Sequence, residues 1–442
     1  MRSAYRVQDV REAEDALLAE LPDGTLMQRA AAGLAASIAD FAGRVYGVRI
    51  LLLIGPGDNG GDALFAGAML ARRGALVQAL LLGEAAHSSG LAALRQAGGR
   101  VVSAVERRPD LVVDGIVGIG GRPGLRPEAA AVVKALAGIA TVAVDTPSGV
   151  GVDDGVVDGV CVHADLTVTF GCLKPVHLLD PDGVCGVVEL VDIGLELPAP
   201  SITSLQDVSL QVASTAHKYT RGVVGIDTGS TSYPGAGVLS VAGALAGPAG
   251  MVRYAGSARE QVLQAHPEAV PGRGRVQAWV VGSGGGDDAA QALRAALADG
   301  VPVVVDADAL AFAQPGCDMV LTPHAGELAR MLAVPRETIE AEPLRWAQAA
   351  SERWQAVVLL KGRRTVIAHP DGRLRINTTG TPHLATAGSG DVLAGLIGSL
   401  LASGLSPFDA ASCGAWLHGA AAQTIGGPFV ASELAVAIRH LR

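Results

Sequence analysis

Apolar residues along the first half of the chain follow two alternating patterns, helical spacing and short continuous runs. Over 7–42 they recur every three or four positions, which predicts two helices divided by Pro22-Asp23-Gly24. Short aliphatic runs predict buried strands at 48–54, 76–82, 111–114, 141–144, 166–170 and 187–192. Helical segments at 63–73, 92–97 and 127–137 lie between several of these strands. Alternating apolar strands and helices predict a parallel sheet that is covered on both faces.

The second half repeats this layer type but not the motifs of the first. Its predicted strands are 223–226, 278–281, 301–306, 319–322, 357–361 and 364–368. Between the halves, 199–213 contains several Ser and Thr residues and reads as either a linker or a short connecting strand. A chain of 442 residues exceeds one typical domain. We therefore expect two α/β domains, over 1–205 and 206–442.

The composition of the chain excludes several classes of binding partner. The net charge of −9 and an aromatic content of 3% disfavour nucleic acid. Five cysteines without a C-x-x-C pair argue against a disulfide framework or a zinc site. No apolar run reaches membrane-spanning length, and the N-terminus has no signal-type hydrophobic region. We expect a soluble, cytoplasmic protein that binds neither membrane nor nucleic acid.

Three small residues and an acid precede an apolar run near the end of the chain, in Gly388-Ser389-Gly390-Asp391. The pattern predicts a helix N-terminus whose free amides favour an anion such as a phosphate. Asp391 is open to two interpretations: a helix cap, or a base that takes the proton of a hydroxyl attacking that phosphate.

Polar clusters follow three predicted strands of the first half, at 58–62, 114–118 and 145–148. The carboxyl ends of parallel strands share one edge of a sheet, so we expect these clusters to meet in one crevice. The oxygens of Asn59, Asp114 and Ser148 suit a hard cation, and the glycine loop after Asp114 suits a pyrophosphate. Asp145 is a candidate proton acceptor. Lys174 is either its acid partner or a surface charge.

The second half carries comparable clusters after its strands. Glycine-rich turns lie at 228–236 and 282–286, and polar residues follow strands at 306–310 and 322–327. His324 lies between Pro323 and Gly326 on the predicted ligand side of the sheet. The basic segment 361–365 joins two strands, where it either faces a nucleotide phosphate or forms a solvated hairpin.

The first-half motifs GPGDNGGDA, DGIVGIGG, DTPSGV and TFGCLKP resemble those of NAD(P)H-hydrate epimerases over most of 1–200. That family interconverts the two epimers of hydrated nicotinamide cofactor and binds potassium. The resemblance implies a Rossmann-like three-layer αβα domain in which Asn59, Asp114 and Ser148 hold potassium and Asp145 meets the substrate. It also implies two further sets of substrate contacts: Asp58, Asn59, Gly60, Gly61 and Asp62, and the diphosphate loop of Gly118, Ile119, Gly120, Gly121, Arg122, Pro123 and Gly124. Two positions depart from the family pattern, since Asp58 replaces the usual Asn and Ala63 the usual Gly.

Six motifs of the second half resemble the ribokinase-like NAD(P)H-hydrate dehydratases: KYTRG, GSTSYPGA, VDADAL, LTPHAGE, KGRRT and TAGSGDVLAG. The resemblance implies a ribokinase-like α/β domain in which Asp391 deprotonates the ring hydroxyl of the S-epimer. The oxygen then attacks the terminal phosphate of ADP, with magnesium neutralising charge. It further implies a hydrate pocket formed by Ala236, Gly285, His324 and Asp391, and nucleotide contacts from Lys361, Gly362, Arg363, Arg364, Thr365, Gly388, Ser389 and Gly390. Ala325 and Gly237 depart mildly from the family pattern.

The leading hypothesis is therefore a bifunctional enzyme that epimerises hydrated NADH or NADPH and dehydrates the S-epimer with ADP. An alternative is a small-molecule (vitamin) kinase with a fused nucleotide-binding regulatory domain. In a third interpretation, the first half only scaffolds the second. We expect a homo-oligomer, and the sequence leaves ADP versus ATP open.

Overall fold

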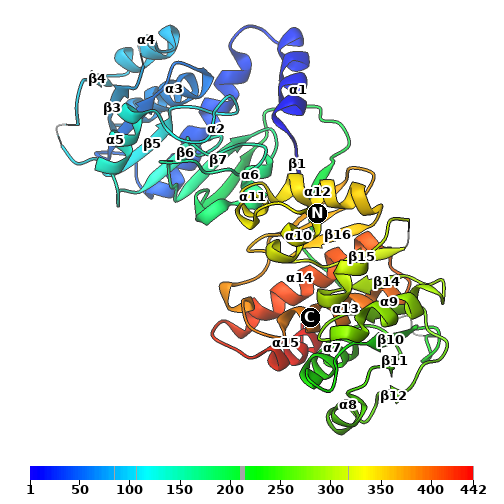
Figure 1. Ribbon diagram of the computed structural model, residues 1–442. Coiled ribbons are helices and arrows are strands. Elements are labelled where there is room, and N and C mark those ends of the chain that lie inside the picture. Colours follow the sequence, from blue (N-terminus) through cyan, green and yellow to red (C-terminus); the bar gives the residue numbers. More distant parts are fainter. Residues whose placement is uncertain (84, 106, 210–214, 317, 442) are drawn as a thin grey trace. The chain divides into compact units, whose positions relative to one another are not determined.

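The computed structural model describes residues 1–83, 85–105, 107–209, 215–316 and 318–441. The chain divides into two compact units, Ser3–Ser201 and Ile202–Arg442, the latter together with Met1–Arg2 (Figure 1). The sequence placed the division at 205/206. Part of the segment 199–213 lies outside the described residues, and its beginning forms the short strand β9 (Ile202–Ser204).

The first unit is built on a seven-stranded sheet in which every neighbouring pair is parallel. Its strand order is β4-β3-β2-β5-β6-β7-β8. The strands are β2 (Arg49–Ile54), β3 (Leu76–Leu81), β4 (Arg100–Val102), β5 (Leu111–Gly115), β6 (Thr141–Val144), β7 (Leu166–Phe170) and β8 (Val187–Val191). The helices are α1 (Val7–Glu20), α2 (Thr25–Ala42), α3 (Asp58–Arg72), α4 (Ser88–Gln96), α5 (Pro127–Ala135) and α6 (Pro175–Leu179), with a short 3₁₀ turn at Pro181–Gly183.

Both faces of this sheet are covered, as the apolar runs predict. Leu52 and Ile54 of β2 pack with residues of α2 and α3, while Leu51 and Leu53 face the cluster that includes Leu136 after α5. One helix boundary was wrong. The helix expected from residue 63 begins at Asp58, because a first-turn acid is stabilised by the helix dipole. The polar residues 58–62 therefore lie in the first turn of α3 rather than in a loop.

The second unit contains a sheet in the order β1-β9-β18-β17-β16-β15-β14-β13-β10-β11-β12, with β1 (Arg2–Ala4) at its edge. The pairs from β12 to β16 are parallel, and β16-β17 and β17-β18 are antiparallel. The other strands are β10 (Val223–Asp227), β11 (Met251–Tyr254), β12 (Val270–Pro271), β13 (Ala278–Val281), β14 (Val303–Val305), β15 (Met319–Leu321), β16 (Val357–Leu360), β17 (Thr365–Ala368) and β18 (Leu374–Asn377).

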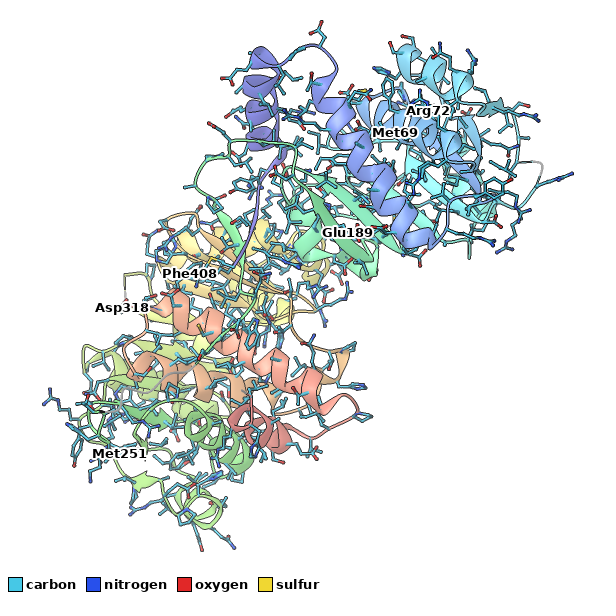
Figure 2. The ribbon with its side chains drawn as sticks, turned by 180° about the vertical axis from the view of Figure 1, so that it is seen from behind. Met69, Arg72, Glu189, Met251, Asp318 and Phe408 are labelled. Atoms are coloured by element: carbon cyan, nitrogen blue, oxygen red, sulfur yellow. The ribbon has the colours of Figure 1, made fainter. Side chains whose placement is uncertain are left out.

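Helices cover this sheet as well. They are α7 (Pro234–Ala246), α8 (Arg259–Ala265), α9 (Ala289–Leu297), α10 (Ala325–Leu332), α11 (Arg336–Ala341), α12 (Pro343–Trp354), α13 (Ser389–Ala402), α14 (Pro407–Ile425) and α15 (Ala431–Arg439). Short 3₁₀ turns lie at Gly286–Asp288, Ala307–Phe312 and Pro382–Leu384. Side chains fill the space between each sheet and its helices, among them Phe408 of α14 (Figure 2).

Helix α13 is the core helix that the sequence predicts. Every residue from Val392 to Ala402 is buried, and α13 packs closely along α7. A Cβ atom on Gly395 would overlap the backbone carbonyl of Ser240, so glycine permits this approach. The packing fixes the N-terminus of α13 and thereby the position of Asp391. Among the described residues, no helix is long and apolar enough to cross a membrane.

Candidate active sites

The end of β5 carries a buried group of oxygen atoms. The carboxylate of Asp114, which is 0% exposed, accepts hydrogen bonds from the Ser148 amide at 2.8 Å and the Ser148 hydroxyl at 2.7 Å. Burial raises the pKa of Asp114 to about 6, although these hydrogen bonds oppose the shift. Asn59 lies against the same loop, since a Cβ atom on Gly118 would overlap its amide group. Asn59, Asp114 and Ser148 thus meet, as predicted, and their oxygens fit a hard cation.

Asp145 and Lys174 form a buried ion pair beside this group. Lys174 is 1% exposed, and its Nζ lies 2.5 Å from Asp145 Oδ1, 3.0 Å from Thr169 Oγ1 and 3.1 Å from the Phe170 carbonyl. Burial by itself would raise the pKa of Asp145, but the Lys174 ammonium group outweighs it and holds that pKa below its usual value. The surface-charge interpretation of Lys174 is therefore wrong.

His177 holds the backbone at Asp145, and sequence reasoning missed it. Its Nδ1 accepts the Lys174 amide at 3.0 Å, so its Nε2 donates to the Asp145 carbonyl at 2.9 Å. Burial and the nearby ammonium group lower the pKa of His177 to about 4, so the ring is neutral. Asp145 has a φ of 65°, a left-handed conformation that a non-glycine residue adopts only when its surroundings hold it there. The three-residue spacing from Lys174 to His177 was the available signal.

The glycine loop 118–124 leaves several amides for a ligand. Gly121 and Gly124 donate their amides within the protein, to the carbonyls of Gly118 and Gly149. Within the described residues, the amides of Gly118, Ile119 and Gly120 have no hydrogen-bond partner. Such a row of free amides suits an anion.

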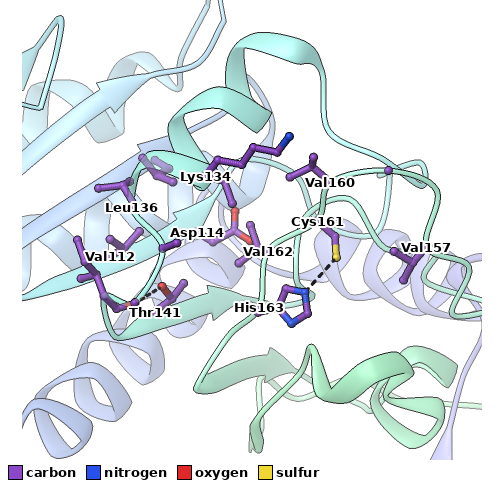
Figure 3. Close-up of a pocket in the computed structure, with 16 residues that line it drawn as sticks. Val112, Asp114, Lys134, Leu136, Thr141, Val157, Val160, Cys161, Val162 and His163 are labelled. Atoms are coloured by element: carbon purple, nitrogen blue, oxygen red, sulfur yellow. Dashed lines mark hydrogen bonds between the residues drawn. The ribbon is translucent and has the colours of Figure 1, made fainter.

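A separate cavity of about 460 Å³ lies on the α5 side of the same sheet. Its walls include Val112, Leu136 and Val162, with Lys134 and His163 also among the lining residues (Figure 3). Of the predicted site residues it reaches only Asp114. Neither Asp145 nor the glycine loop 118–124 lines this cavity.

The second unit contains another lysine–aspartate pair, in which the aspartate is buried and the lysine is partly buried. Asp306, at the end of β14, is 2% exposed and lies 2.8 Å from the Lys361 Nζ, the Ser283 hydroxyl and the Thr322 hydroxyl. Burial opposes ionisation of Asp306, but the Lys361 ammonium group outweighs it and lowers the pKa. Lys361 also approaches Glu327 Oε2 at 3.8 Å. The sequence singled out the segments of Asp306, Ser283 and Thr322 but gave these residues no role.

Asp391 lies in the first turn of α13, and the residue that caps this helix, Gly388, has a φ of 87°. Burial and the Asp306 carboxylate raise the pKa of Asp391 to about 7, against the opposing effects of Lys361 and a hydrogen bond from Ser283. The Nζ of Lys361 lies 3.5 Å from the place a Cβ atom would take on Gly390, so the lysine faces this turn. Asp391 is thus poised to exchange a proton near neutral pH.

Comparison with known proteins follows the division into two units. A family model described as NAD(P)H-hydrate dehydratase matches residues 224–438, and one described as YjeF-related protein N-terminus matches 23–176. A bifunctional NAD(P)H-hydrate repair enzyme Nnr of Mycobacterium leprae is 48% identical over 96% of this chain and 94% of its own. That of Corynebacterium glutamicum is 37% identical over 91% and 87%.

This chain belongs to the family of bifunctional NAD(P)H-hydrate repair enzymes. A solved structure, the ADP/ATP-dependent NAD(P)H-hydrate dehydratase of Bacillus subtilis co-crystallised with ATP and Mg²⁺, resembles part of it at 31% identity. The TM-score is 0.50, over 52% of this chain and 92% of that one. The α/β fold expected from the sequence, with a ribokinase-like dehydratase domain, is confirmed.

Three other residues of the second unit were predicted to line the hydrate pocket: Ala236, Gly285 and His324. Ala236 lies beside the loop of Gly284 and Gly285, which brings two predicted parts of the hydrate pocket together. His324 caps α10, its Nδ1 accepting the Glu327 amide at 3.1 Å, and its side chain is 54% exposed. It therefore has a structural role, and whether it also contacts substrate stays a prediction.

The turn between β16 and β17 carries three other predicted nucleotide contacts, Gly362, Arg363 and Arg364, and Thr365 begins β17. Arg364 donates to the Thr378 carbonyl at 2.6 Å, so one of its side-chain nitrogens is already bonded within the repair enzyme. His418 of α14 was missed by sequence reasoning. Its Nε2 lies 3.0 Å from the Ser389 carbonyl, and burial lowers its pKa to about 4. The neutral ring is therefore hydrogen-bonded to the first turn of α13.

Proposed function

We propose that this chain repairs hydrated NADH and NADPH, the first unit epimerising the hydrate and the second dehydrating its S-epimer with a nucleotide phosphate donor. Membership of the family supports the two activities. The single observation that carries the proposal is Asp391, a partly buried carboxyl with a pKa raised to about 7 at a helix N-terminus. A base of that pKa beside an anion site is what phosphoryl transfer to a hydroxyl requires.

In the second unit, Asp391 takes the proton of the ring hydroxyl as the oxygen attacks the terminal phosphorus of ADP. The bond from that phosphorus to its bridging oxygen breaks, and AMP leaves. The ring then loses inorganic phosphate and a neighbouring C–H proton, which restores the double bond of the dihydropyridine. The free amides at Gly390 and Asp391 stabilise the transferring phosphate. Magnesium, when bound with the nucleotide, would neutralise phosphate charge, and Asp391 and Glu327 are the carboxyl groups that we propose would hold it.

In the first unit, we assign the hydrate to the crevice beside Asp145 and Lys174, with its diphosphate on the free amides of Gly118 to Gly120. Asn59, Asp114 and Ser148 supply the oxygens of a potassium site. Potassium, when bound there, supplies positive charge near the diphosphate. The ion pair keeps Asp145 ionised and able to accept a proton.

The proposal is tested with purified full-length protein, mixed hydrate epimers, ADP and Mg²⁺, by following recovery of the reduced-cofactor absorbance. We expect complete recovery from the mixture, and loss of recovery in Asp391→Asn. Asp145→Asn should slow only the conversion of the R-epimer, with pure S-epimer as the matched control. Full activity of Asp391→Asn contradicts the assigned base. A phosphorylated product that persists without elimination supports the small-molecule kinase alternative.

Three finer points belong to the same proposal. ADP is proposed as the donor over ATP, and parallel assays with each nucleotide decide between them. A cytoplasmic location is proposed because the reduced cofactors and ADP are metabolites of that compartment. The homo-oligomer stays a prediction, which light scattering on the purified protein checks.

A further inference from the structure

Asp62 is a buried carboxyl group without a hydrogen-bond donor. It lies in the first turn of α3, on the edge of the sheet where β2, β5 and β6 end. The residue is only 7% exposed. Across the described part of the chain, no donor contacts its side-chain oxygens. An ionised carboxylate in such a place is unfavourable, because burial removes water and no protein group replaces it.

The charges around Asp62 are negative. Asp145, Asp58 and Glu14 all act on it electrostatically and, together with burial as the main cause, raise its pKa well above the usual value. They come from three elements: the loop after β6, α3 itself, and α1. Lys174, the cation paired with Asp145, is already held by Asp145, Thr169 and the Phe170 carbonyl.

Other groups near this turn do not change that balance. His87 contacts the neighbouring position at Gly61, but its Nδ1 accepts the amide of Gly90. Asp62 therefore keeps its proton. Asp145, which directly follows β6 at the same edge of the sheet, stays ionised. Two carboxyl groups that act on each other electrostatically are held in opposite protonation states, and such a pair is how acid and base roles are divided in many enzymes.

We propose that Asp62 is the proton donor of the epimerase, with the Asp145 carboxylate as the proton acceptor. This inference rests on the proposed function of the first unit and gives a role to a residue that the family resemblance names only as a substrate contact. Three observations support the proposal together: the position of Asp62 in the first turn of α3, the absence of a hydrogen-bond donor to its carboxyl group among the described residues, and the carboxyl groups around it.

The step balances in atoms and electrons. Asp62 gives its proton to the hydroxyl group on the ring carbon beside the ring nitrogen. The C–O bond breaks, water leaves with the bonding pair, and the nitrogen lone pair forms a C=N⁺ bond. Water then adds to the opposite face of that carbon, the C=N⁺ electrons return to nitrogen, and Asp145 takes the proton. The reverse conversion uses the same groups in exchanged roles, and exchange with solvent resets them.

Two variants and one matched control test the assignment, in the full-length protein. Asp62→Asn keeps the shape but cannot give up a proton, and we expect kcat for the R-epimer to fall roughly 10²–10⁴-fold with little change in KM. Asp62→Glu should recover part of that loss. Asp40→Asn, at an exposed position of α2, should retain activity within a few fold. Dehydration of pure S-epimer should be unchanged in all three, which shows that the protein is folded.

Two further measurements, isotope labelling and the pH dependence of stability, distinguish a proton donor from a residue that only contacts the substrate. In H₂¹⁸O the epimerised product should carry ¹⁸O at its hydroxyl. Because the folded-state pKa of Asp62 is raised, wild type should lose stability as pH rises from the unfolded pKa toward the folded one. Asp62→Asn should lack this loss and melt higher than wild type above neutral pH, with the difference vanishing at low pH.

The outcomes separate two kinds of failure. If wild type does not epimerise the hydrate, both the proposed function and this inference fail. If wild type is active and Asp62→Asn keeps its full kcat, only the role of Asp62 is overturned. Raised KM with unchanged kcat makes Asp62 a binding residue, and a product that retains ¹⁶O rules out the C–O cleavage step.

Discussion

The rate of dehydration should depend on pH through the ionisation of Asp391. The charges around Asp391 determine the pH at which this change occurs. Its pKa of about 7 results from burial and from the Asp306 carboxylate. A base acts when ionised, so kcat should rise with pH through that value and level off above it. Asp391 would be about one-tenth ionised at pH 6 and about nine-tenths ionised at pH 8, which makes the expected change in kcat roughly tenfold.

Asp306→Asn provides the decisive perturbation. It removes the negative charge that raises the pKa of Asp391 and releases Lys361, whose Nζ lies 2.8 Å from Asp306 Oδ1, to interact with Asp391 instead. Both effects favour the ionised base, so the midpoint of the kcat profile should move to lower pH. Asp308→Asn is the matched control, since Asp308 is exposed and two residues away.

The assay is steady-state recovery of reduced cofactor from pure S-epimer at saturating nucleotide, from pH 5 to 9 in steps of about 0.5. Melting curves at each pH confirm that the variants stay folded. Ionisation of the nucleotide affects all three proteins equally, so the displacement between their profiles isolates the protein group. An Asp306→Asn profile that coincides with wild type would falsify the proposed coupling between the two carboxyl groups.

Three further outcomes follow from the described contacts. Lys174→Met leaves the Asp145 carboxylate buried without its cation and should destabilise the first unit by about 3–5 kcal/mol; adding Asp145→Asn should restore part of this in urea unfolding, and no restoration contradicts the pairing. Gly395→Ala places a Cβ atom against an α7 carbonyl and should cost about 1–3 kcal/mol. Gly235→Ala, whose Cβ would meet open space, should cost almost nothing, and equal melting temperatures for the two would show that the helices are not tightly packed. Replacing potassium with sodium should slow epimerisation but not dehydration, and Ser148→Ala should weaken the response to potassium; an unaltered epimerisation rate argues against the cation site.

The two units arrive at the same electrostatic arrangement with unrelated motifs. Each holds a Lys–Asp pair with a buried aspartate near the ends of its central strands, Lys174–Asp145 in one and Lys361–Asp306 in the other. Each also places a further carboxyl, Asp62 or Asp391, where burial and a neighbouring carboxylate raise its pKa. The pair stays ionised because lysine and aspartate neutralise each other, while the third group keeps its proton until chemistry requires it.

The sequence by itself determined the layers, the strand ends and the turn that precedes α13. Apolar runs and helical spacing depend on neighbouring positions, and the glycine at 388 is required by a local backbone conformation. These features can be predicted from the sequence without knowing which residues they contact in the folded protein. The candidate residues Asp145, directly after a strand, and Asp391, in the first turn of a helix, could be named for the same reason.

Only the tertiary structure decided how those residues are charged. Lys174 reaches Asp145 across 29 positions of sequence and Lys361 reaches Asp306 across 55, and the pKa of each carboxyl group follows from burial and from charges brought close by folding. His177 and His418 were missed because a histidine that holds a carbonyl is recognisable only once that carbonyl is beside it. Electrostatic interactions act through space, so candidate residues could be named from the sequence, whereas their protonation states follow from the fold.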